Sequence, residues 1–404
     1  MAESFRFDWV VVRSAAPTAF PKPDGLGTAI AAPSSTPRGA VLVGAGARPA
    51  PAGSVSVSTE KMSYGETREV FRETSGIIGA APLLPMTLIQ PAASTATKAP
   101  PIDRGFKAVG ADVSKRDGTG VTVAVLDTGI DPGHPAFDGV DLIRQNFTTA
   151  EDDDVHGHGT HCAGTIFGRD VDGTRIGVAR GVRRALIGKV LGPRGGDTEA
   201  IVRAVMWAKG LGADVISMSL GMDFTAYQEA LVQRGLPPRQ ATALTLEAFR
   251  LNILLFASLS RAIAGQSGLV DGSVVLAAAG NSSMAPDYTI AAEPPSNSEG
   301  FISVAALDKP KAGRQRLASF SNVGAKIAAP GVDVWSAALG GGLVAMSGTS
   351  MATPMAAGLA CLWAEQLGQN ATSGQIIDAL RTNARPLSPD IPQADVEWGQ
   401  ATAP

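Results

Sequence analysis

Cysteine is nearly absent from this sequence, which has two, Cys162 and Cys361, among 404 residues. Two thiols cannot build the disulfide framework that stabilises small secreted domains. Both lie in apolar, helix-like stretches, so we expect two buried, reduced thiols. Aromatic residues are also scarce, at 5% of the chain, whereas glycine is abundant with 47 residues. Small residues of this kind suit the close packing of helices on strands.

The chain also lacks an excess of charge and a long apolar run. Its net charge is -3, which gives no reason to expect nucleic acid or an anionic membrane as a partner. The N-terminus has neither the basic start nor the cleavage site of a Sec signal peptide. The apolar stretches at residues 77–89 and 251–264 are too short or too interrupted for a membrane span. We therefore expect a cytoplasmic protein with no membrane partner; the sequence does not indicate the oligomeric state.

Composition divides the chain into two parts. Residues 1–104 contain clusters of proline and alanine, with short strands expected at 7–12, 40–43, 54–58 and 85–89, a brief helix at 66–73 and a linker at 91–101. From residue 105 to 404 the pattern is regular. Apolar, β-branched runs at 121–126, 185–191, 214–220 and 273–279 predict buried strands. Periodic segments at 158–167, 198–210, 350–366 and 375–382 predict helices.

Strands that alternate with helices are typical of parallel sheets. The predicted fold is therefore α/β, a doubly wound, mostly parallel sheet flanked by helices, preceded by a smaller α+β N-terminal region. A helical insertion near residues 222–269, with a break at Pro237 and Pro238, interrupts the pattern. Packing is its favoured role; a part in the substrate cleft or in a dimer contact is the alternative.

Four short motifs carry reactive side chains near the ends of the predicted elements. Asp127 ends the strand 121–126, His158 begins a helix, Asn281 follows the strand 273–279, and Ser350 opens an apolar helix. Ligands of a parallel sheet bind beyond the carboxyl ends of its strands, so these groups should meet there. A carboxylate, an imidazole, an amide donor and a hydroxyl are the groups that acyl transfer by a serine hydrolase needs.

These motifs resemble those of the subtilisin-like serine proteases, the subtilases or peptidase family S8, of the proteinase K or intracellular subtilisin types. The matching motifs, in chain order, are Asp-Thr-Gly from Asp127, His-Gly-Thr-His-Cys-Ala-Gly from His158, Ala-Ala-Gly-Asn ending at Asn281, and Gly-Thr-Ser-Met-Ala-Thr-Pro around Ser350.

The resemblance implies a serine endopeptidase with an Asp127–His158–Ser350 triad and Asn281 as an oxyanion donor. Each residue alone also fits a structural role: a turn for Asp127 and Asn281, a helix start for His158, a helix cap for Ser350. One active site explains all four together better than four coincidences do.

Substrate-binding residues follow from the same resemblance. It implies that Ser219, Leu220 and Gly221 form one wall of the S1 pocket and pair with the substrate backbone, while Ala278, Ala279 and Gly280 form the opposite wall. Walls of small residues leave room for a large side chain at P1, the residue whose carbonyl is attacked. We expect a broad or apolar P1 preference. The sequence places no acid at the base of this pocket, because the position of Glu293 does not follow from it.

Metals and thiols have minor expected roles. The acidic and histidine-rich stretch 152–161 lacks His-Glu-x-x-His spacing and is more simply a solvated loop that leads into a helix, so we predict no metal ligands. No cofactor is expected to be required. The resemblance implies calcium as a possible structural ion, for which Asp170 and Asp172 are candidates, unless Arg175 pairs with them. Cys162, four residues after His158, should pack near the imidazole as a small buried side chain.

Several functional alternatives remain open at this point. The N-terminal region is either a pro-region cut within about residues 90–101 or a permanent domain. The enzyme is either a broad endopeptidase or a dedicated processing protease for one peptide or protein substrate. A non-catalytic, peptide-binding scaffold is the third alternative, which four intact reactive groups disfavour.

Overall fold

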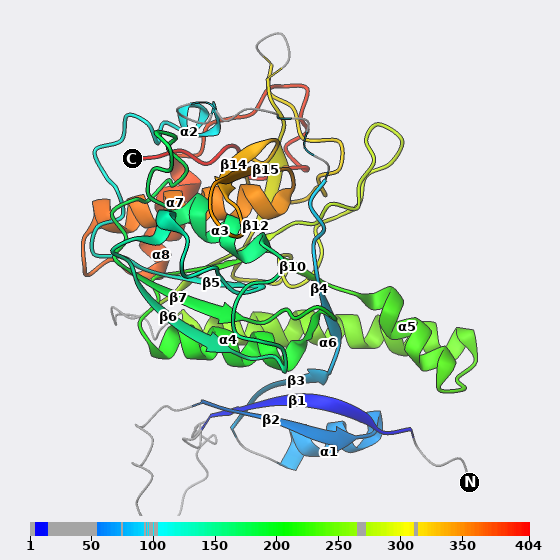
Figure 1. Ribbon diagram of the computed structural model, residues 1–404. Helices are drawn as coiled ribbons and strands as arrows, with labels where there is room; N and C mark the ends of the chain where they lie inside the picture. Colours follow the sequence, from blue (N-terminus) through cyan, green and yellow to red (C-terminus); the bar gives the residue numbers. More distant parts are fainter. Residues whose placement is uncertain are drawn as a thin grey trace, which may run out of the picture.

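A seven-stranded parallel sheet forms the centre of the computed structural model, which describes residues 5–14, 55–73, 76–92, 94, 96, 100, 104–264, 272–310 and 314–404 (Figure 1). The strand order is β13-β12-β11-β9-β5-β7-β6. The strands are β5 (Thr122–Asp127), β6 (Asp141–Asn146), β7 (Arg184–Lys189), β9 (Val215–Met218), β11 (Val274–Ala278), β12 (Phe301–Leu307) and β13 (Ile327–Pro330). The expected α/β fold is confirmed.

Helices cover both faces of this sheet, because its central strands are apolar on both sides. On β5, Val123 and Val125 point into one core, while Ala124 and Leu126 point into the other. The first core includes α3 (His158–Phe167), α7 (Thr349–Leu367) and α8 (Ser373–Thr382), and the second includes α4 (Thr198–Gly210) and α6 (Pro238–Ile263).

The N-terminal region forms its own small antiparallel sheet. Its order is β2-β1-β3, built from β1 (Phe7–Ser14), β2 (Val55–Met62) and β3 (Ile77–Pro82), with α1 (Tyr64–Glu73) beside it. This sheet lies beneath the helices of the second core, where β3 packs on α6 and β2 on α4 (Figure 1). The strand expected at residues 40–43 lies outside the described residues, and the division at residue 104 stays a prediction.

A short strand connects this region with the main body. The strand β4 (Pro85–Leu88) lies between β10 (Leu220–Met222) and β8 (Gly196–Asp197), and pairs antiparallel with both. Figure 1 shows the chain rising from the N-terminal sheet along β4 past the carboxyl ends of the parallel strands. The first part of the chain therefore reaches the sheet edge at which the predicted site residues lie.

The insertion consists of α5 (Phe224–Gln233) and α6, and α6 begins at Pro238 as the sequence predicts. Asn252 on α6 is fully buried and donates to the Pro82 carbonyl at 3.0 Å, while its own oxygen accepts from Thr198 at 3.1 Å. Packing against the N-terminal sheet is thus a role of the insertion. By length and composition α6 is also apolar enough to cross a membrane, which is weak support for a span because buried core helices pass the same test.

Several elements were not expected from the sequence. Three of them, the strands β6, β12 and β13, belong to the central sheet. Two more, β14 (Val334–Ala337) and β15 (Leu343–Met346), form a separate hairpin. Edge strand β6 is mostly polar and exposed, so it lacks the apolar run of a buried strand. The short helices η1 (Pro135–Phe137) and α2 (Arg104–Ala108) complete the fold.

Replacing Asn252 tests the link between α6 and the N-terminal sheet. We expect Asn252→Ala to lower the free energy of unfolding by about 1–3 kcal/mol, because the buried Pro82 carbonyl and Thr198 hydroxyl lose a partner. Chemical denaturation in a Ser350→Ala background, which prevents proteolysis, measures this loss. Asn383→Ala is the control. Asn383 is exposed and, like Asn252, donates to the carbonyl of the residue four positions earlier. Equal losses in both variants would contradict the role given to Asn252.

Candidate active site

The first pair of predicted site residues is in direct contact. Asp127 is the last residue of β5 and His158 the first of α3, and Asp127 Oδ1 lies 2.8 Å from His158 Nδ1. Both side chains are buried. The close approach of the two elements requires glycine, because a Cβ on Gly159 would lie 2.2 Å from the Gly129 carbonyl oxygen. The predicted Asp127–His158 pair is therefore present in the structure.

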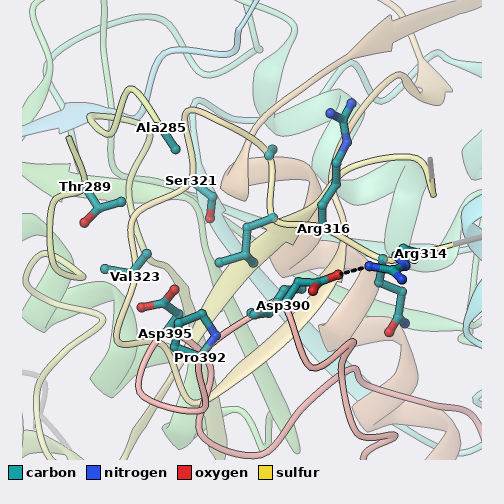
Figure 2. Close-up of a pocket in the computed structure, with 13 residues that line it drawn as sticks. Ala285, Thr289, Arg314, Arg316, Ser321, Val323, Asp390, Pro392 and Asp395 are labelled. Atoms are coloured by element: carbon teal, nitrogen blue, oxygen red, sulfur yellow. Dashed lines mark hydrogen bonds and ion pairs between the residues drawn. The ribbon is translucent and has the colours of Figure 1, made fainter. Parts of the chain in front are cut away.

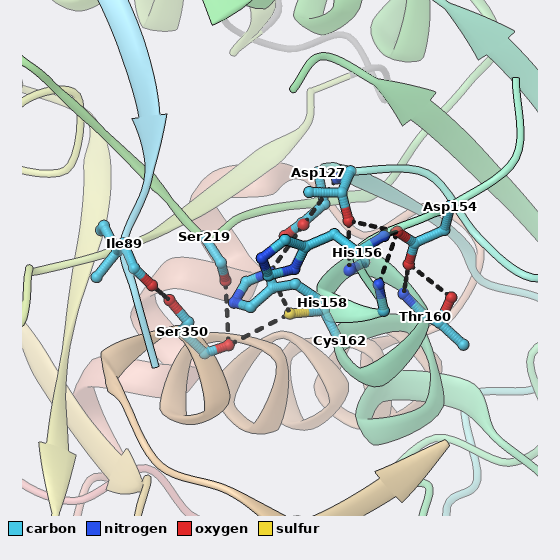
Figure 3. Close-up of polar contacts among 12 residues, drawn as sticks. Ile89, Asp127, Asp154, His156, His158, Thr160, Cys162, Ser219 and Ser350 are labelled. Atoms are coloured by element: carbon cyan, nitrogen blue, oxygen red, sulfur yellow. Dashed lines mark hydrogen bonds and ion pairs between the residues drawn. The ribbon is translucent and has the colours of Figure 1, made fainter. Parts of the chain in front are cut away.

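A second carboxylate, Asp154, holds the segment around this pair (Figure 3). Its Oδ1 accepts hydrogen bonds from the Thr128 hydroxyl and from the N–H groups of His156 and Gly157, each at 2.9 Å. Its Oδ2 accepts from the Thr160 N–H at 3.0 Å and the Thr160 hydroxyl at 2.7 Å. Asp154 thus joins the end of β5 to the start of α3, so the solvated-loop interpretation was wrong for this residue.

The surroundings of Asp154 favour its charged form. Burial raises the pKa of this carboxyl, but the hydrogen bonds from the Thr160 side chain and from the Gly157, Thr160 and His156 N–H groups outweigh it and leave the pKa lowered. Its stabilising contribution is therefore present above the ordinary pKa of a carboxyl group and is lost as the pH falls through the lowered value. Its neighbours Asp152 and Asp153 are exposed.

The imidazole of His158 is strongly biased towards its charged form. Burial lowers its pKa, but the negative charge of Asp127 and its hydrogen bond to the ring outweigh burial and raise the pKa well above the ordinary value. Its Nε2 is buried and has no hydrogen-bond partner among the described residues. This nitrogen is the atom that would accept a proton from a nucleophile.

Cys162 packs against the imidazole, as predicted from its helical spacing. Its Sγ lies 3.8 Å from His158 Nδ1 and 3.4 Å from the Ser350 carbonyl oxygen. Burial raises the pKa of this thiol, so it stays neutral. Cys162 and Cys361 are both buried and free, which confirms the expectation for both residues.

Ser350 and Asn281 meet at the start of α7. The Asn281 side-chain oxygen accepts from the Thr349 N–H and the Thr349 hydroxyl, each at 2.9 Å, which turns its amide nitrogen towards β4. Ser350 is the second residue of α7, where an N–H group has no acceptor within the helix. An amide donor and a backbone N–H that has no acceptor among the described residues therefore lie close together at this helix start, both beside Gly348.

The chain's own residues occupy the space in front of these donors. The Ser350 hydroxyl donates to the Ile89 carbonyl at 3.2 Å, and Asn281 Nδ2 donates to the Gln90 carbonyl at 2.9 Å (Figure 3 shows the first). Two residues on, the Ala92 N–H donates to the Ser347 carbonyl at 2.7 Å. The Ser350 hydroxyl is thus directed to the residue that follows β4 and makes no hydrogen bond with His158.

The predicted substrate-binding residues flank this segment. In the β4–β10 pairing, Leu220 faces Leu88 and Gly221 faces Thr87. Ser219 precedes this strand and donates through its hydroxyl to the Ser350 carbonyl at 3.1 Å. Opposite, Ala278 ends β11, the Ala279 carbonyl accepts from the Glu293 N–H at 3.0 Å, and the Gly280 N–H donates to Thr349. The edge formed by these residues thus holds an extended segment of the chain itself.

The profile of the subtilase family (Peptidase_S8) matches residues 118–399, which is more than half of the chain. The chain belongs to the subtilase family. A thermophilic serine proteinase from Bacillus sp. (strain AK1) is 35% identical over 272 residues, 66% of this chain and 57% of that protein. Subtilisin DY from Bacillus licheniformis is 36% identical over 251 residues, 61% of this chain and 77% of that protein.

A solved structure agrees on the fold. Fervidolysin from Fervidobacterium pennivorans, described as a keratinolytic enzyme related to subtilisin, matches with a TM-score of 0.59 and 23% identity, over 81% of this chain and 52% of that one. This subtilase spans little more than half the length of fervidolysin and of the AK1 proteinase. These similarities therefore establish the family and the fold.

His161, the second histidine of the catalytic motif, has a structural role in this subtilase. His161 is buried with Nε2 3.0 Å from the Val334 carbonyl, and burial together with the charge of His158 lowers its pKa to about 3. Among the described residues, the group spaced for metal ligation is Asp127, His158 and Cys162, which is the site just described. His156 and His161 are not part of it.

The candidate calcium loop does not suit a cation. Arg180 donates to both carboxylate oxygens of Asp170, at 2.9 and 3.1 Å. Arg175, the expected partner, donates instead to the carbonyls of Gly177 and Val178. Subtilases commonly bind structural calcium, but here a guanidinium already compensates the charge of Asp170, so this loop does not fit the ion.

A cavity of about 470 Å³ lies apart from these residues (Figure 2). Its lining includes Arg314 and Asp390, which form an ion pair at 3.0 Å across its rim. None of the predicted site residues lines it. We therefore assign it no part in the site.

Replacing Asp154 tests its role in holding the site. We expect Asp154→Asn to lower the free energy of unfolding by about 2–4 kcal/mol. The amide NH₂ group would replace one carboxylate oxygen and would face N–H and O–H groups from which that oxygen now accepts hydrogen bonds. Denaturation at neutral pH in the Ser350→Ala background measures the loss. Asp153→Asn is the control and should change stability by less than about 0.5 kcal/mol, because Asp153 is exposed. A loss no larger than that of the control would refute the role of Asp154.

Proposed function

We propose that this protein is a serine endopeptidase that acts through Asp127, His158 and Ser350. The observation that carries the proposal is the extended segment at the site, where a Ser350 hydroxyl and an Asn281 amide each meet a backbone carbonyl. The buried Asp127–His158 pair beside them supplies the base. The AK1 relative, which is named a serine proteinase, supports the same proposal.

The catalytic steps follow from these positions. Ser350 Oγ attacks the substrate carbonyl carbon while its proton passes to His158 Nε2, and the charge of Asp127 stabilises the imidazolium. Asn281 Nδ2 and the Ser350 N–H, at the positive end of α7, stabilise the oxyanion. His158 then protonates the leaving amine, and water cleaves the acyl-enzyme by the same route. The walls formed by Gly221 and Gly280 admit a broad range of P1 side chains.

In this form of the chain the cleft is closed to other peptides. Residues 86–88 pair with β10 along the edge on which a substrate would add as a strand, and Ala92 forms a bridge with Ser347. The carbonyls nearest the two reactive groups belong to Ile89 and Gln90, so self-cleavage would break the bond that follows one of them. We propose a zymogen in which the N-terminal region occupies its own active site. Calcium as a structural ion, peptide substrates and a cytoplasmic location stay predictions.

Active-site labelling with a fluorophosphonate probe tests the proposal. We expect wild type, and not Ser350→Ala, to be labelled, because only an activated serine reacts. The intact mass of both proteins shows whether the chain is cut after residue 89 or 90, and only wild type should be cut. If full-length wild type is not labelled, trace trypsin should release labelling by removing the N-terminal region. Absence of labelling after that step would mean a scaffold without catalysis.

The pH dependence of activity tests the charge on His158. The base must be neutral, and the pKa of His158 is raised, so kcat/KM should increase only at a pH above the ordinary titration range of histidine. Asp127→Asn removes the charge that raises this pKa and should move the increase to lower pH while reducing kcat. Asp153→Asn should leave it in place. An increase centred near the ordinary histidine pKa in wild type would argue against this assignment.

A further inference from the structure

The carboxyl group of Glu293 lies between the two walls of the proposed P1 pocket. A Cβ placed on Gly280 would lie 2.5 Å from Glu293 Oε1, and one placed on Gly221 would lie 3.3 Å from Oε2. The two oxygens therefore face opposite walls. The Glu293 N–H also donates to the Ala279 carbonyl at 3.0 Å, which ties its backbone to the second wall.

Neutral groups alone hold this carboxylate among the described residues. Ser282 Oγ and Asn322 Nδ2 donate to Oε1, at 3.0 and 2.9 Å. Asn322 is itself fixed, because its oxygen accepts from the N–H groups of Ser282 and Ser283. No described lysine, arginine or histidine forms an ion pair with Glu293. The carboxylate is thus held in place, partly buried and without a compensating cation among the described residues.

An apolar side chain of the chain's own segment reaches the same wall, Gly221, as Oε2. The Cβ position on Gly221 that is 3.3 Å from Oε2 is also 3.4 Å from Ile89 Cγ1. The isoleucine side chain has no hydrogen-bond donor, so this occupant cannot donate to Oε2. Lysine or arginine in its place would extend further along the same direction and bring N–H donors to the carboxylate. A cavity of about 560 Å³ adjoins Glu293 and leaves space beside it.

We propose that Glu293 determines the specificity of the P1 pocket and selects substrates with lysine or arginine at P1. This inference rests on the proposed endopeptidase function. It narrows the broad preference that the small-residue walls suggest, because a partly buried acid without a cation favours a positively charged side chain over an apolar one of equal length. The Ile89 segment is then a poorly matched occupant of its own cleft, which a basic substrate would replace.

A pair of matched peptide substrates tests the selection. Fluorogenic peptides that differ only in lysine or norleucine at P1 have side chains of similar length, so their ratio of kcat/KM reports the charge. We expect wild type to prefer lysine at least tenfold, and Glu293→Gln to abolish or reverse this preference while norleucine cleavage persists. Glu299→Gln is the control, because Glu299 is an exposed acid that pairs with Arg261. Equal cleavage of both peptides, or a preference that survives Glu293→Gln, would overturn the proposal.

A second measurement is independent of catalysis. In the inactive Ser350→Ala chain, Ile89→Lys and Ile89→Met are compared by their thermal unfolding midpoints, with and without Glu293→Gln. In the background that carries Glu293→Gln, we expect the lysine variant to be less stable than the methionine variant. In the background that keeps Glu293 we expect no such loss, because Glu293 pairs with the ammonium group. The same difference in both backgrounds would refute the contact.

The two measurements separate the proposals. Peptide cleavage and probe labelling without a charge preference overturn the specificity proposal alone. Absence of both activities, even after trypsin treatment, overturns the endopeptidase function, and the Ile89 variants then still decide whether Glu293 faces the residue in the cleft.

Discussion

The antiparallel pairing of β4 with β10 is the contact on which the arrangement of this molecule depends. It is short, with three facing residue pairs, yet it connects the N-terminal sheet to the edge of the central sheet. Because backbone hydrogen bonds define it, many sequences could occupy the same position. Its placement brings the Ile89 and Gln90 carbonyls to the Ser350 hydroxyl and the Asn281 amide. The same edge that would recognise a substrate thus determines how the N-terminal region docks.

Two buried carboxylates at this edge have different partners and therefore different roles. Asp154 accepts hydrogen bonds from groups that do not titrate, so its charge stabilises the local backbone. Asp127 faces an imidazole that can change its charge, so its energy is coupled to proton transfer. Glu293 represents a third case, an acid with two neutral donors and no cationic partner in the part of the chain that the structure describes. The role of each carboxylate thus follows from the groups that face it: donors that do not titrate for Asp154, a titrating imidazole for Asp127, and neutral donors alone for Glu293.

Much of the fold and of the site was predictable from local sequence. Asp127, His158, Asn281 and Ser350 lie in short motifs at element ends, and a parallel sheet brings such ends together. Contacts between distant segments could not be predicted in this way. Asp154 looks like one member of an acidic run, and only the fold shows that it is buried by Thr128 and Thr160.

The position of Glu293 likewise depends on the chain returning beside Ala279, which the local sequence does not indicate. A polar edge strand such as β6 has no periodic pattern of apolar residues by which it could be predicted. Thr349 is a further example, because its sequence neighbour Ser350 is the recognisable residue, while Thr349 sets the direction of the Asn281 amide.

The packing of β3 on α6 and of β2 on α4 has a consequence for the timing of activity. Before any cut, residues 85–92 compete for the cleft at the effective concentration of a tethered segment, which for short linkers is on the order of millimolar. Cutting the chain near residue 90 would break the tether but leave this packing intact, so the N-terminal fragment would remain bound as a separate molecule. Release of the fragment would then depend on its dilution or its degradation. The cleft would therefore become accessible to other peptides only some time after the cut.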